Sequence, residues 1–543
     1  MSFSEEKVPI KTPAGLSRAL LVVIQVFCFV NFQTYSEKYK ISDVTYALEK
    51  TRERDLRRTV SIDTERIFED RDELDEYLSD LNQRLLNTRA FQSVEIKDSS
   101  LSEPNADSES DSTEITQLSI HIDAKDTRHL LILPYPKYDS NDGLIFKIKV
   151  KDVNFLGTMN TLDAGVFAGL KEDTSTGNQN LTFGAEFKYS YPFQVGPFIC
   201  SWNNSLDAVY TRGVNELEFW TGTGFTFELP FQGFSLVLTA SEEANRDLEY
   251  EALKDEQYFT SDINLSIPVK ILDIENWGHV FWTPFTEGKV SYDRDKINID
   301  NDDLASPVLS IGQSVSTERI NWYGNFRNGL SLKIGHSMGY DFQQEETEPK
   351  IYGELQGFKA FSHIALNTRF TFFRTNSNRE YVGNLIRGVR DKQLYVTGKD
   401  LFTYRALKAP SAIAINIDIP IHVITTDWLS WSEAIFGEDS WFSRRFAWTG
   451  KFNFELQVSP FMDFALTKNE ATGRLFSLKD GWYTGGLEFL VFPEKWKGIV
   501  LRASLGIDMG RALIAKKYPE KLDMSWREDI KKYEIFAGIG LHY

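Results

Sequence analysis

From about residue 128 to the C-terminal residue, apolar side chains alternate with other side chains in one stretch after another. The clearest stretch places Ile413, Ile415, Ile417, Ile419 and Ile421 at every second position, with Ala414, Asn416, Asp418 and Pro420 between them. A period of two is that of a β-strand, whose successive side chains point to opposite faces. Each such strand therefore has one apolar face and one mixed face.

Composition indicates what those apolar faces contact. Aromatic residues make up 14% of the chain and Phe occurs 40 times, yet the mean hydropathy is −0.32. Outer-membrane β-barrels combine these properties, because lipid-facing and lumen-facing side chains alternate while aromatic residues gather at the membrane interfaces. A large soluble β-sandwich is the alternative. We favour an all-β transmembrane antiparallel barrel over residues 128–543.

The connections between the predicted strands are of two kinds. Short connections combine Gly or Pro with aromatic residues, as near Asn154, Tyr191, Leu229 and Pro493, whereas long acidic ones cover 296–305, 343–349, 467–480 and 514–531. Short periplasmic turns and long external loops alternate in this way in barrels, so we expect an even number of strands, about 16 to 18. The exception lies at 427–441, where Trp428 and Trp431 indicate an interfacial helix or an ordinary aromatic-rich turn.

The N-terminus has the features of an export signal. Lys7, Lys11 and Arg18 precede an apolar run over residues 19–30. This run is too short to cross a bilayer as a helix and suits a secretory signal. We therefore assign residues 1–34 to an export signal or N-terminal anchor. Cys28 would permit lipidation, but Phe27 stands where a small residue is needed.

Residues 39–127 predict one compact α+β periplasmic domain. Apolar residues at 74, 77, 78, 81 and 85 recur at helical spacing, and a strand follows over residues 91–96. Another strand is predicted at 115–123. Between them, residues 97–114 are polar and without periodicity, which predicts a disordered loop.

Charge and motifs exclude several classes of function. The net charge is −18 with no dense basic run, so we expect no nucleic-acid partner. The two cysteines, Cys28 and Cys200, do not make a disulfide framework. The seven histidines form no His-Glu-x-x-His, and nucleophile-elbow, P-loop and complete dinucleotide motifs are missing. Residues 300–303 lack the spaced glycine and glutamate of a calcium loop. We therefore predict no enzyme activity, cofactor or metal.

Several motifs resemble those of a known family. Residues 152–157 (DVNFLG), 386–389 (IRGV), 461–465 (FMDFA) and 538–543 (GIGLHY) are similar to landmarks of the BamA-type bacterial surface antigen family. Residues 86–94 (LNTRAFQSV) resemble part of a polypeptide-transport-associated (POTRA) domain. The resemblance covers about 39–543 and implies a barrel of about 16 strands that inserts or translocates proteins at the outer membrane. That family usually has a string of POTRA domains, whereas this chain has room for one.

The resemblance also implies a site inside the lumen. In the family, a loop arginine meets an aspartate of a nearby strand, and the matching residues here are Arg387 and Asp463, with Gly388 and Phe461 beside them. Val389 and Ala465 depart from the family pattern. Parity supports the pairing, because Asp463 and Phe461 share one strand face while Met462 takes the lipid side. Asp418, on the face of Asn416, is the fallback acid. An ordinary solvated loop over 375–410, including Asn384, Arg390, Asp391 and Lys392, is the alternative.

The ends of the barrel give a second candidate site. A barrel closes by pairing its first and last strands, here expected near residues 131–133 and 538. Gly538 and Gly540 should weaken the last strand, and a weak seam could open to accept an incoming strand. Alternatively, these glycines with a terminal, outward-facing Tyr543 are only the chain's own insertion signal.

Two classes of function follow from these observations. The first is an assembly, insertion or translocation factor in the outer membrane of a diderm bacterium. Its partners would be unfolded outer-membrane precursors, outer-membrane lipids and periplasmic accessory proteins. The precursors would bind the exposed strand edge at Phe91, Gln92, Ser93, Val94 and Ile96. The second class is a passive pore or surface adhesin whose soluble domain serves only as a tether.

Overall fold

The computed structural model describes residues 37–100, 115–139, 143–172, 179–212, 216–247, 256–274, 277–293, 304, 306–376, 380–389, 395–397, 403–405, 408–437, 440–469, 471–526 and 532–543. The predicted export signal, Cys28 and residues 101–114 lie outside these ranges. None of the helices in the described ranges is long and apolar enough to cross a membrane.

The N-terminal module is a four-stranded sheet with two helices. Its elements are β1 (Lys38–Leu48), α2 (Glu53–Thr59), β2 (Ile67–Phe68), α3 (Arg71–Asn87), β3 (Phe91–Ser100) and β4 (Ile115–Asp126). The strands lie in the order β2-β1-β4-β3. On α3 the predicted apolar residues Leu74, Leu81 and Leu85 are buried. Residues 97–100, which we expected in a loop, instead form the last part of β3. The alternation of exposed and half-buried side chains in this strand continues past residue 96.

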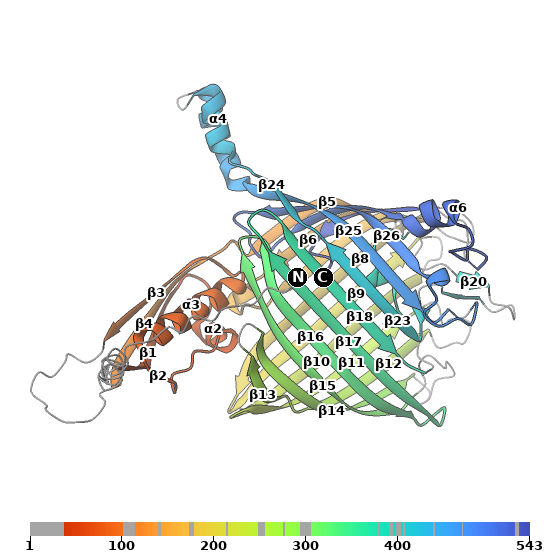
Figure 1. The fold of residues 1–543 in the computed structure, drawn as a ribbon, viewed down its shortest axis with the longest axis horizontal. Helices are drawn as coiled ribbons and strands as arrows, with labels where there is room; N and C mark the ends of the chain where they lie inside the picture. The colour runs from red at the N-terminus through yellow and green to blue at the C-terminus, as the bar shows by residue number, and fades with distance from the viewer. Residues whose placement is uncertain are drawn as a thin grey trace, which may run out of the picture. The chain divides into compact units, whose positions relative to one another are not determined.

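The rest of the chain forms a closed antiparallel barrel (Figure 1). Its strand segments are β5 (Leu130–Asp139), β6 (Gly143–Asp152), β7 (Leu162–Glu172), β8 (Gln179–Val195), β9 (Phe198–Thr211), β10 (Glu216–Phe231), β11 (Phe234–Arg246), β12 (Gln257–Ser266), β13 (Val269–Ile274), β14 (Gly278–Tyr292), β15 (Val308–Tyr323), β16 (Phe326–Asp341), β17 (Glu346–Ala360), β18 (Ala365–Arg374), β23 (Ser411–Asp418), β24 (Ile421–Thr425), β25 (Phe454–Thr467), β26 (Trp482–Pro493), β27 (Leu501–Asp508) and β28 (Tyr533–Ile539).

These segments make 18 full strands of the barrel wall, here called staves. The barrel sheet holds 20 segments, but β12 with β13 and β23 with β24 are each two halves of one interrupted stave, since both halves pair with the same neighbour. Proline at 268 and at 420 stands at each interruption, and proline removes an N–H from the ladder. Counted over the described residues, the barrel thus lies at the upper end of the 16 to 18 strands that we expected.

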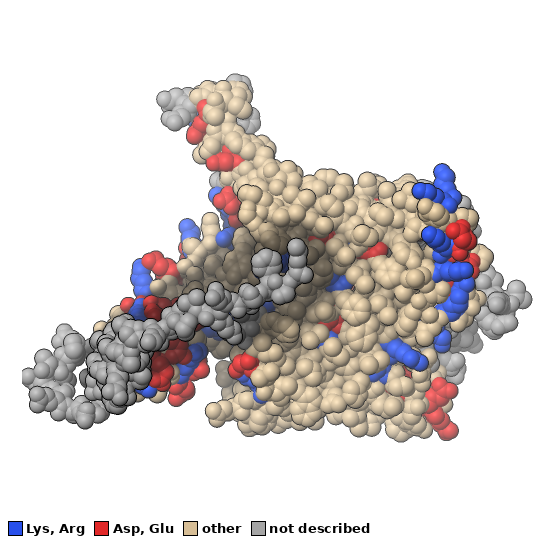
Figure 2. Space-filling view, viewed as in Figure 1, with Lys and Arg blue, Asp and Glu red and all other residues tan. Residues whose placement is uncertain are grey.

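The alternation of the sequence explains the two faces of the wall. On β6, Leu144, Phe146 and Ile148 are exposed on the outside, whereas Lys147 is buried on the inner face. On β23, Ile415 and the following Ile419 are exposed while Asn416 and Asp418 are buried. Figure 2 shows the outcome: the visible outer wall is almost free of charged residues, which gather at the end that carries α6 (Ala515–Lys517) and β20 (Tyr395–Thr397).

The two ends of the barrel differ in their connections. At the end where the chain enters β5, tight turns join β8 to β9, β10 to β11 and β15 to β16. Longer connections at the opposite end join β14 to β15, β18 to β23, β25 to β26 and β27 to β28. The predicted long loop at 343–349 is wrong, because β16 ends at residue 341 and β17 begins at residue 346, so that only four residues connect them.

Candidate functional site in the lumen and at the seam

Arg387 lies inside the barrel and binds the carboxylate of Asp463 on β25. Its backbone N–H donates to Asp463 Oδ2 over 2.8 Å, its Nε donates to the same oxygen over 2.9 Å, and its Nη2 donates to Oδ1 over 2.7 Å. Both side chains are buried. This is the bidentate fork expected of an arginine and a carboxylate, with a third bond from the backbone.

Two further acids and a ring complete the surroundings of the guanidinium. Nη1 lies 2.7 Å from Asp418 Oδ1 on β23 and 3.5 Å from Glu488 Oε1 on β26. The guanidinium carbon stands 3.9 Å from the centre of the Phe461 ring. One cation thus joins three neighbouring staves from the inside. Because its partners are buried with it, removing one member leaves a buried charge unpaired.

Gly388 brings the same loop against the last staves. Its φ is +80°, and a Cβ there would lie 2.9 Å from the backbone nitrogen of Ile507 on β27. A Cβ on Gly506 would come 2.4 Å from Gly388 Cα. The Gly388 N–H donates to the buried Glu534 on β28. Only glycine allows this close approach to β27. The hydrogen bond to Glu534 attaches the loop to the last barrel strand as well.

An apolar core fills the space between the loop and the wall. Val382, Ile386 and Val389 of the loop are buried against the inner face of β18, β23, β25 and β26. The wall contributes Phe373, Ala412, Ala414, Ala465 and Trp482. The departures from the family motif, Val389 and Ala465, are both part of this core. Small alanines on the inner face leave room for the loop backbone, and Asn416 Nδ2 donates to Leu385 O over 2.6 Å.

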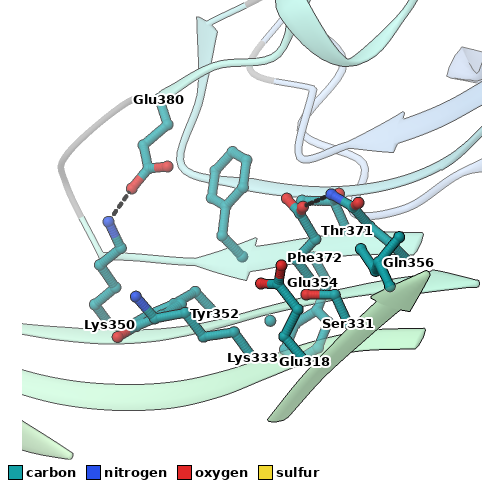
Figure 3. Close-up of a pocket in the computed structure, with 13 residues that line it drawn as sticks. Glu318, Ser331, Lys333, Lys350, Tyr352, Glu354, Gln356, Thr371, Phe372 and Glu380 are labelled. Carbon is teal, nitrogen blue, oxygen red and sulfur yellow. Dashed lines mark hydrogen bonds and ion pairs between the residues drawn. The ribbon is translucent and has the colours of Figure 1, made fainter. Parts of the chain in front are cut away.

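The loop therefore does not behave as a solvated surface loop over residues 380–389. Its 3-10 turn, η4 (Gly383–Leu385), contains Asn384 and precedes the arginine. At the start of the segment, Glu380 pairs with Lys350 of β17 (Figure 3). Arg390, Asp391 and Lys392, which we assigned to the same loop, lie outside the described residues.

Figure 3 shows a recess inside the wall formed by β15 to β18, next to the start of this loop. The recess has a volume of about 520 Å³ and carries both charges, with Glu318, Glu354 and Glu380 near Lys333 and Lys350. Arg369 on β18 also pairs with Glu354 over 2.7 Å. In the recess, Glu318 of β15 lies opposite Ser331 of β16. The described residues contain no group of three or more His, Cys, Asp or Glu side chains that could hold a metal.

The seam between the first and last strands is poorly paired. Among the described residues, β28 and β5 share one residue pair, Phe536 opposite Asp139. Residues 140–142, which the same register would place opposite residues 533–535, lie outside the described ranges. Pro134 and Pro136 of β5 carry no N–H for a ladder. The register also corrects our expectation that residue 538 faces residues 131–133. Continued from this pair, the antiparallel register places residue 538 opposite residue 137.

Each glycine near the end of the last strand has a defined local environment, and the prediction that these glycines weaken the strand stays a prediction. Gly538 lies under the Phe536 ring, which a Cβ would meet at 2.6 Å, so the ring covers the missing side chain. Gly540 has a φ of +106° and its N–H donates to Val500 O over 2.8 Å. A glycine is required where the chain turns in this way.

Beyond Gly540 the chain leaves the strand, so the prediction of an outward-facing Tyr543 is wrong. The Tyr543 carbonyl accepts a hydrogen bond from Arg327 Nη1 over 2.8 Å, and its ring lies 5.8 Å from the guanidinium of Arg369. Period two continues in the sequence as far as residue 543, but the positive φ at Gly540 redirects the last residues into the barrel.

In the module, the predicted binding edge is an edge strand. β3 is the last strand in the order β2-β1-β4-β3. Gln92 and Ser93 are exposed, Phe91 is buried, and Val94 and Ile96 are half-buried. Among the described residues, only β4 pairs with β3, so a second chain could pair with its other side. The Gln92 carbonyl at this strand accepts a hydrogen bond from Lys497 Nζ over 3.1 Å.

At the loop end of the barrel, an ionic cluster joins two long connections. Arg474 pairs with Asp480 and with Asp523. Hydrogen bonds from Ser525 and Arg474 lower the pKa of Asp523 to about 2, and the two carboxylates raise the pKa of Arg474. The connections after β25 and after β27 are thereby fastened together. No sequence motif indicated this contact.

The sequence also missed Glu488, Glu534 and Asn416 as partners of the loop. Glu488 and Glu534 each stand in an alternating strand at an inward position, next to apolar outward neighbours. An acidic residue at an inward position of such a strand could have indicated them. Strand parity, however, predicts only which face of the sheet a side chain takes, and not which part of the barrel lies across the lumen from it.

Comparisons with known proteins found similarity only among solved structures. No family model matches the sequence, and no curated protein matches it. BamA from Haemophilus ducreyi lacking POTRA domains 1–3 has 13% identity and a TM-score of 0.36, with 92% of this chain and 84% of that chain covered. CdiB from Acinetobacter baumannii has 11% identity and a TM-score of 0.42, covering 93% and 74%. The siderophore receptor PirA from Pseudomonas aeruginosa has 9% identity and a TM-score of 0.29, covering 78% and 83%.

Proposed function

We propose that this protein is an outer-membrane barrel that inserts or translocates polypeptides by opening the seam between β28 and β5. The module receives unfolded barrel precursors along the free edge of β3. The observation that carries the proposal is the seam itself, where the described residues of the first and last strands form one residue pair. Unpaired backbone groups at an open seam could be satisfied by an incoming strand, by β-augmentation.

A membrane location is supported by the outer wall. Large apolar side chains such as Ile132, Ile311 and Met338 are more than half exposed, and the closed sheet leaves no long free edge in the bilayer except at the seam. The inner wall carries the charged residues. This distribution is that of a barrel with lipid outside and water inside.

The lumenal loop supports a gated role over a passive pore. Arg387 and Gly388 fasten the loop to β23, β25, β26 and β28, all on the C-terminal side of the seam. None of the described loop contacts above reaches β5. The loop would therefore hold the last staves as one unit while the first strand separates from them.

A reconstitution experiment tests the proposal. Proteoliposomes containing the protein should accelerate the folding of a urea-denatured outer-membrane barrel, measured by its shift on semi-native gels. The matched variant pairs Ala537→Cys with Tyr138→Cys across the seam, in a background with Cys28→Ser and Cys200→Ala. Oxidation should abolish the acceleration, and reductant should restore it. Full activity with a verified disulfide would remove seam opening from the mechanism.

The module has its own test in cells. Photocrosslinkers at Gln92 and Ser93 should capture unfolded barrel precursors, and depletion of the protein should lower the amount of other barrels in the outer membrane. A crosslinker at Glu37, before β1 of the same sheet, serves as the control. A passive pore or adhesin would give neither capture nor a change in the other barrels.

A further inference from the structure

The connection between β24 and β25 is the one long insertion at the tight-turn end of the barrel. It holds α4 (Trp428–Phe436), α5 (Trp441–Phe446) and the 3-10 segment η5 (Ala447–Phe452). Asp427 caps α4, accepting a hydrogen bond from Ser430 N over 3.2 Å. The described helical segments of this connection are here called the 427–452 hairpin; residues 438 and 439 lie outside the described ranges. Figure 1 shows α4 extending away from the barrel wall.

This hairpin exposes more large apolar side chains than a water-facing element tolerates. Ile435 is 73% exposed, Trp441 is 66% exposed, and Trp448 and Phe452 are each more than half exposed. No residue of α4 is buried. Contiguous apolar patches of this kind mark a surface that another apolar phase covers.

The apolar surface of the hairpin continues into the outer wall of the barrel. Exposed Ile421, Val423 and Ile424 of β24 lead into α4. The Trp428 ring then lies 6.2 Å from the Phe454 ring, at the start of β25. The face that contacts lipid on the barrel and the face of the hairpin therefore form one surface.

The other end of the hairpin reaches toward the seam. The Phe452 ring stacks 6.5 Å from the Trp496 ring, in the turn between β26 and β27. Trp496 Nε1 donates to the carbonyl of Leu130, the first residue of β5, over 2.9 Å. An aromatic chain thus links the hairpin to the first strand of the barrel.

We propose that the 427–452 hairpin lies in the interfacial region of the bilayer leaflet at the tight-turn end, beside the seam, with lipid as its partner. The proposal rests on the membrane location argued above and adds to it a second point of lipid contact outside the barrel wall. Tryptophan and arginine are the residues that suit this depth, because they combine apolar bodies with polar groups. The tryptophans of the hairpin are Trp428, Trp431, Trp441 and Trp448, and the exposed Arg445 can reach lipid phosphates.

Site-specific quenching tests the proposal. In the background with Cys28→Ser and Cys200→Ala, an environment-sensitive fluorophore is attached to Ile435→Cys. The protein is reconstituted into phosphatidylcholine vesicles with or without lipid that carries a nitroxide near the headgroup. The nitroxide lipid should lower the emission about twofold or more, because the label lies at headgroup depth. Aqueous iodide should quench the label little.

Two control positions separate this proposal from the membrane location itself. A label at Ile311→Cys, which is 65% exposed on β15, reports the barrel wall. A label at exposed Lys516→Cys on α6 reports water at the opposite end. If the nitroxide lipid quenches at 311 but iodide alone quenches at 435, the hairpin is not in the bilayer and instead faces water or a protein partner. If lipid quenches at neither position, the membrane location fails too.

Discussion

Two parts of the same barrel wall are built with different strength. On one side, β15 and β16 pair without interruption from Val308 opposite Asp341 to Tyr323 opposite Phe326. At the seam, the described residues of β28 and β5 share a single pair. Each backbone hydrogen bond adds a net free energy of roughly 1 kcal/mol, so the two junctions differ by many such contributions. We therefore expect the wall to open at the seam first, while the rest of the sheet stays intact.

The inside of the barrel shows the same contrast. The loop joins β23, β25, β26 and β28 through Arg387 and Gly388. The described backbone pairing between β28 and β5 is sparse in comparison. From this arrangement we expect the first strand to be more mobile than the C-terminal strands β23 to β28, which the loop joins. Substitutions at Arg387 or Gly388 should therefore reduce the stability of the C-terminal strands. Substitutions at the seam should alter activity with less effect on stability.

The largest effect should come from reversing the charge of Arg387. Arg387→Glu places a fourth carboxylate beside Asp463, Asp418 and Glu488, so the loop should leave the lumen. The cost should be on the order of 2 to 4 kcal/mol, because buried charges lose their partner. The heat resistance of the barrel on semi-native gels should fall, and external protease should cleave the loop.

The double change Arg387→Glu with Asp463→Arg is the control for this prediction. It restores one buried pair and should return part of both the heat resistance and the protease protection. Arg387→Lys should still impair the protein, because lysine cannot make the two-pronged contact. If the loop of Arg387→Glu resists external protease as well as the wild-type loop does, the ion pairs of Arg387 do not hold the loop in the lumen.

A smaller effect is expected from Gly388→Ala. The substitution combines a φ of +80° with a Cβ placed 2.9 Å from the Ile507 nitrogen, and the strain should cost about 1 to 3 kcal/mol. Thermal unfolding followed by circular dichroism measures it. Gly473→Ala is the matched control, since Gly473 has a φ of +70° and open space around its Cβ position. Equal losses in the two variants would mean that the contact with β27 is unimportant.

Gly540→Ala should affect the seam more than the barrel as a whole. The residue has a φ of +106° with nothing near its Cβ position, so the cost is conformational, about 1 kcal/mol. The inward turn of residues 541–543 should loosen and the Arg327 contact should weaken. Limited digestion with carboxypeptidase should then release Tyr543 faster than in wild type. Gly196→Ala, in a turn with φ +57°, should leave that rate unchanged.

The smallest effect concerns pH at the loop end. The pKa of Asp523 is lowered to about 2 by Ser525 and Arg474, so this carboxylate stabilises the folded loops fully above its unfolded pKa near 4. The stabilisation is lost as the pH falls from about 4 to 2. Protease cleavage of residues 514–526 by pepsin should therefore increase over that range. In Asp523→Asn the increase should be smaller, and an unchanged increase would assign it to other groups.

The sequence allowed the strands, the two faces and the inward position of Asp463 to be predicted, because these depend on period two alone. The pairing with Arg387 came from a family resemblance. The partners Glu488 and Glu534 could not be predicted, since they depend on which staves stand next to the loop in space. The inward turn of Tyr543 depends on a single φ at Gly540, and the alternation across it gives no sign of the turn.

Amide hydrogen exchange in nanodiscs, resolved by peptide, tests the central claim most directly. If the barrel opens at the seam, amides of β28 and β5 should exchange much faster than those of β15 and β16 at the same membrane depth. Closing the seam with the disulfide between residues 537 and 138 should slow the exchange of β28 and β5 and leave β15 and β16 unchanged. Equal protection of the two junctions in the uncrosslinked protein would contradict the account.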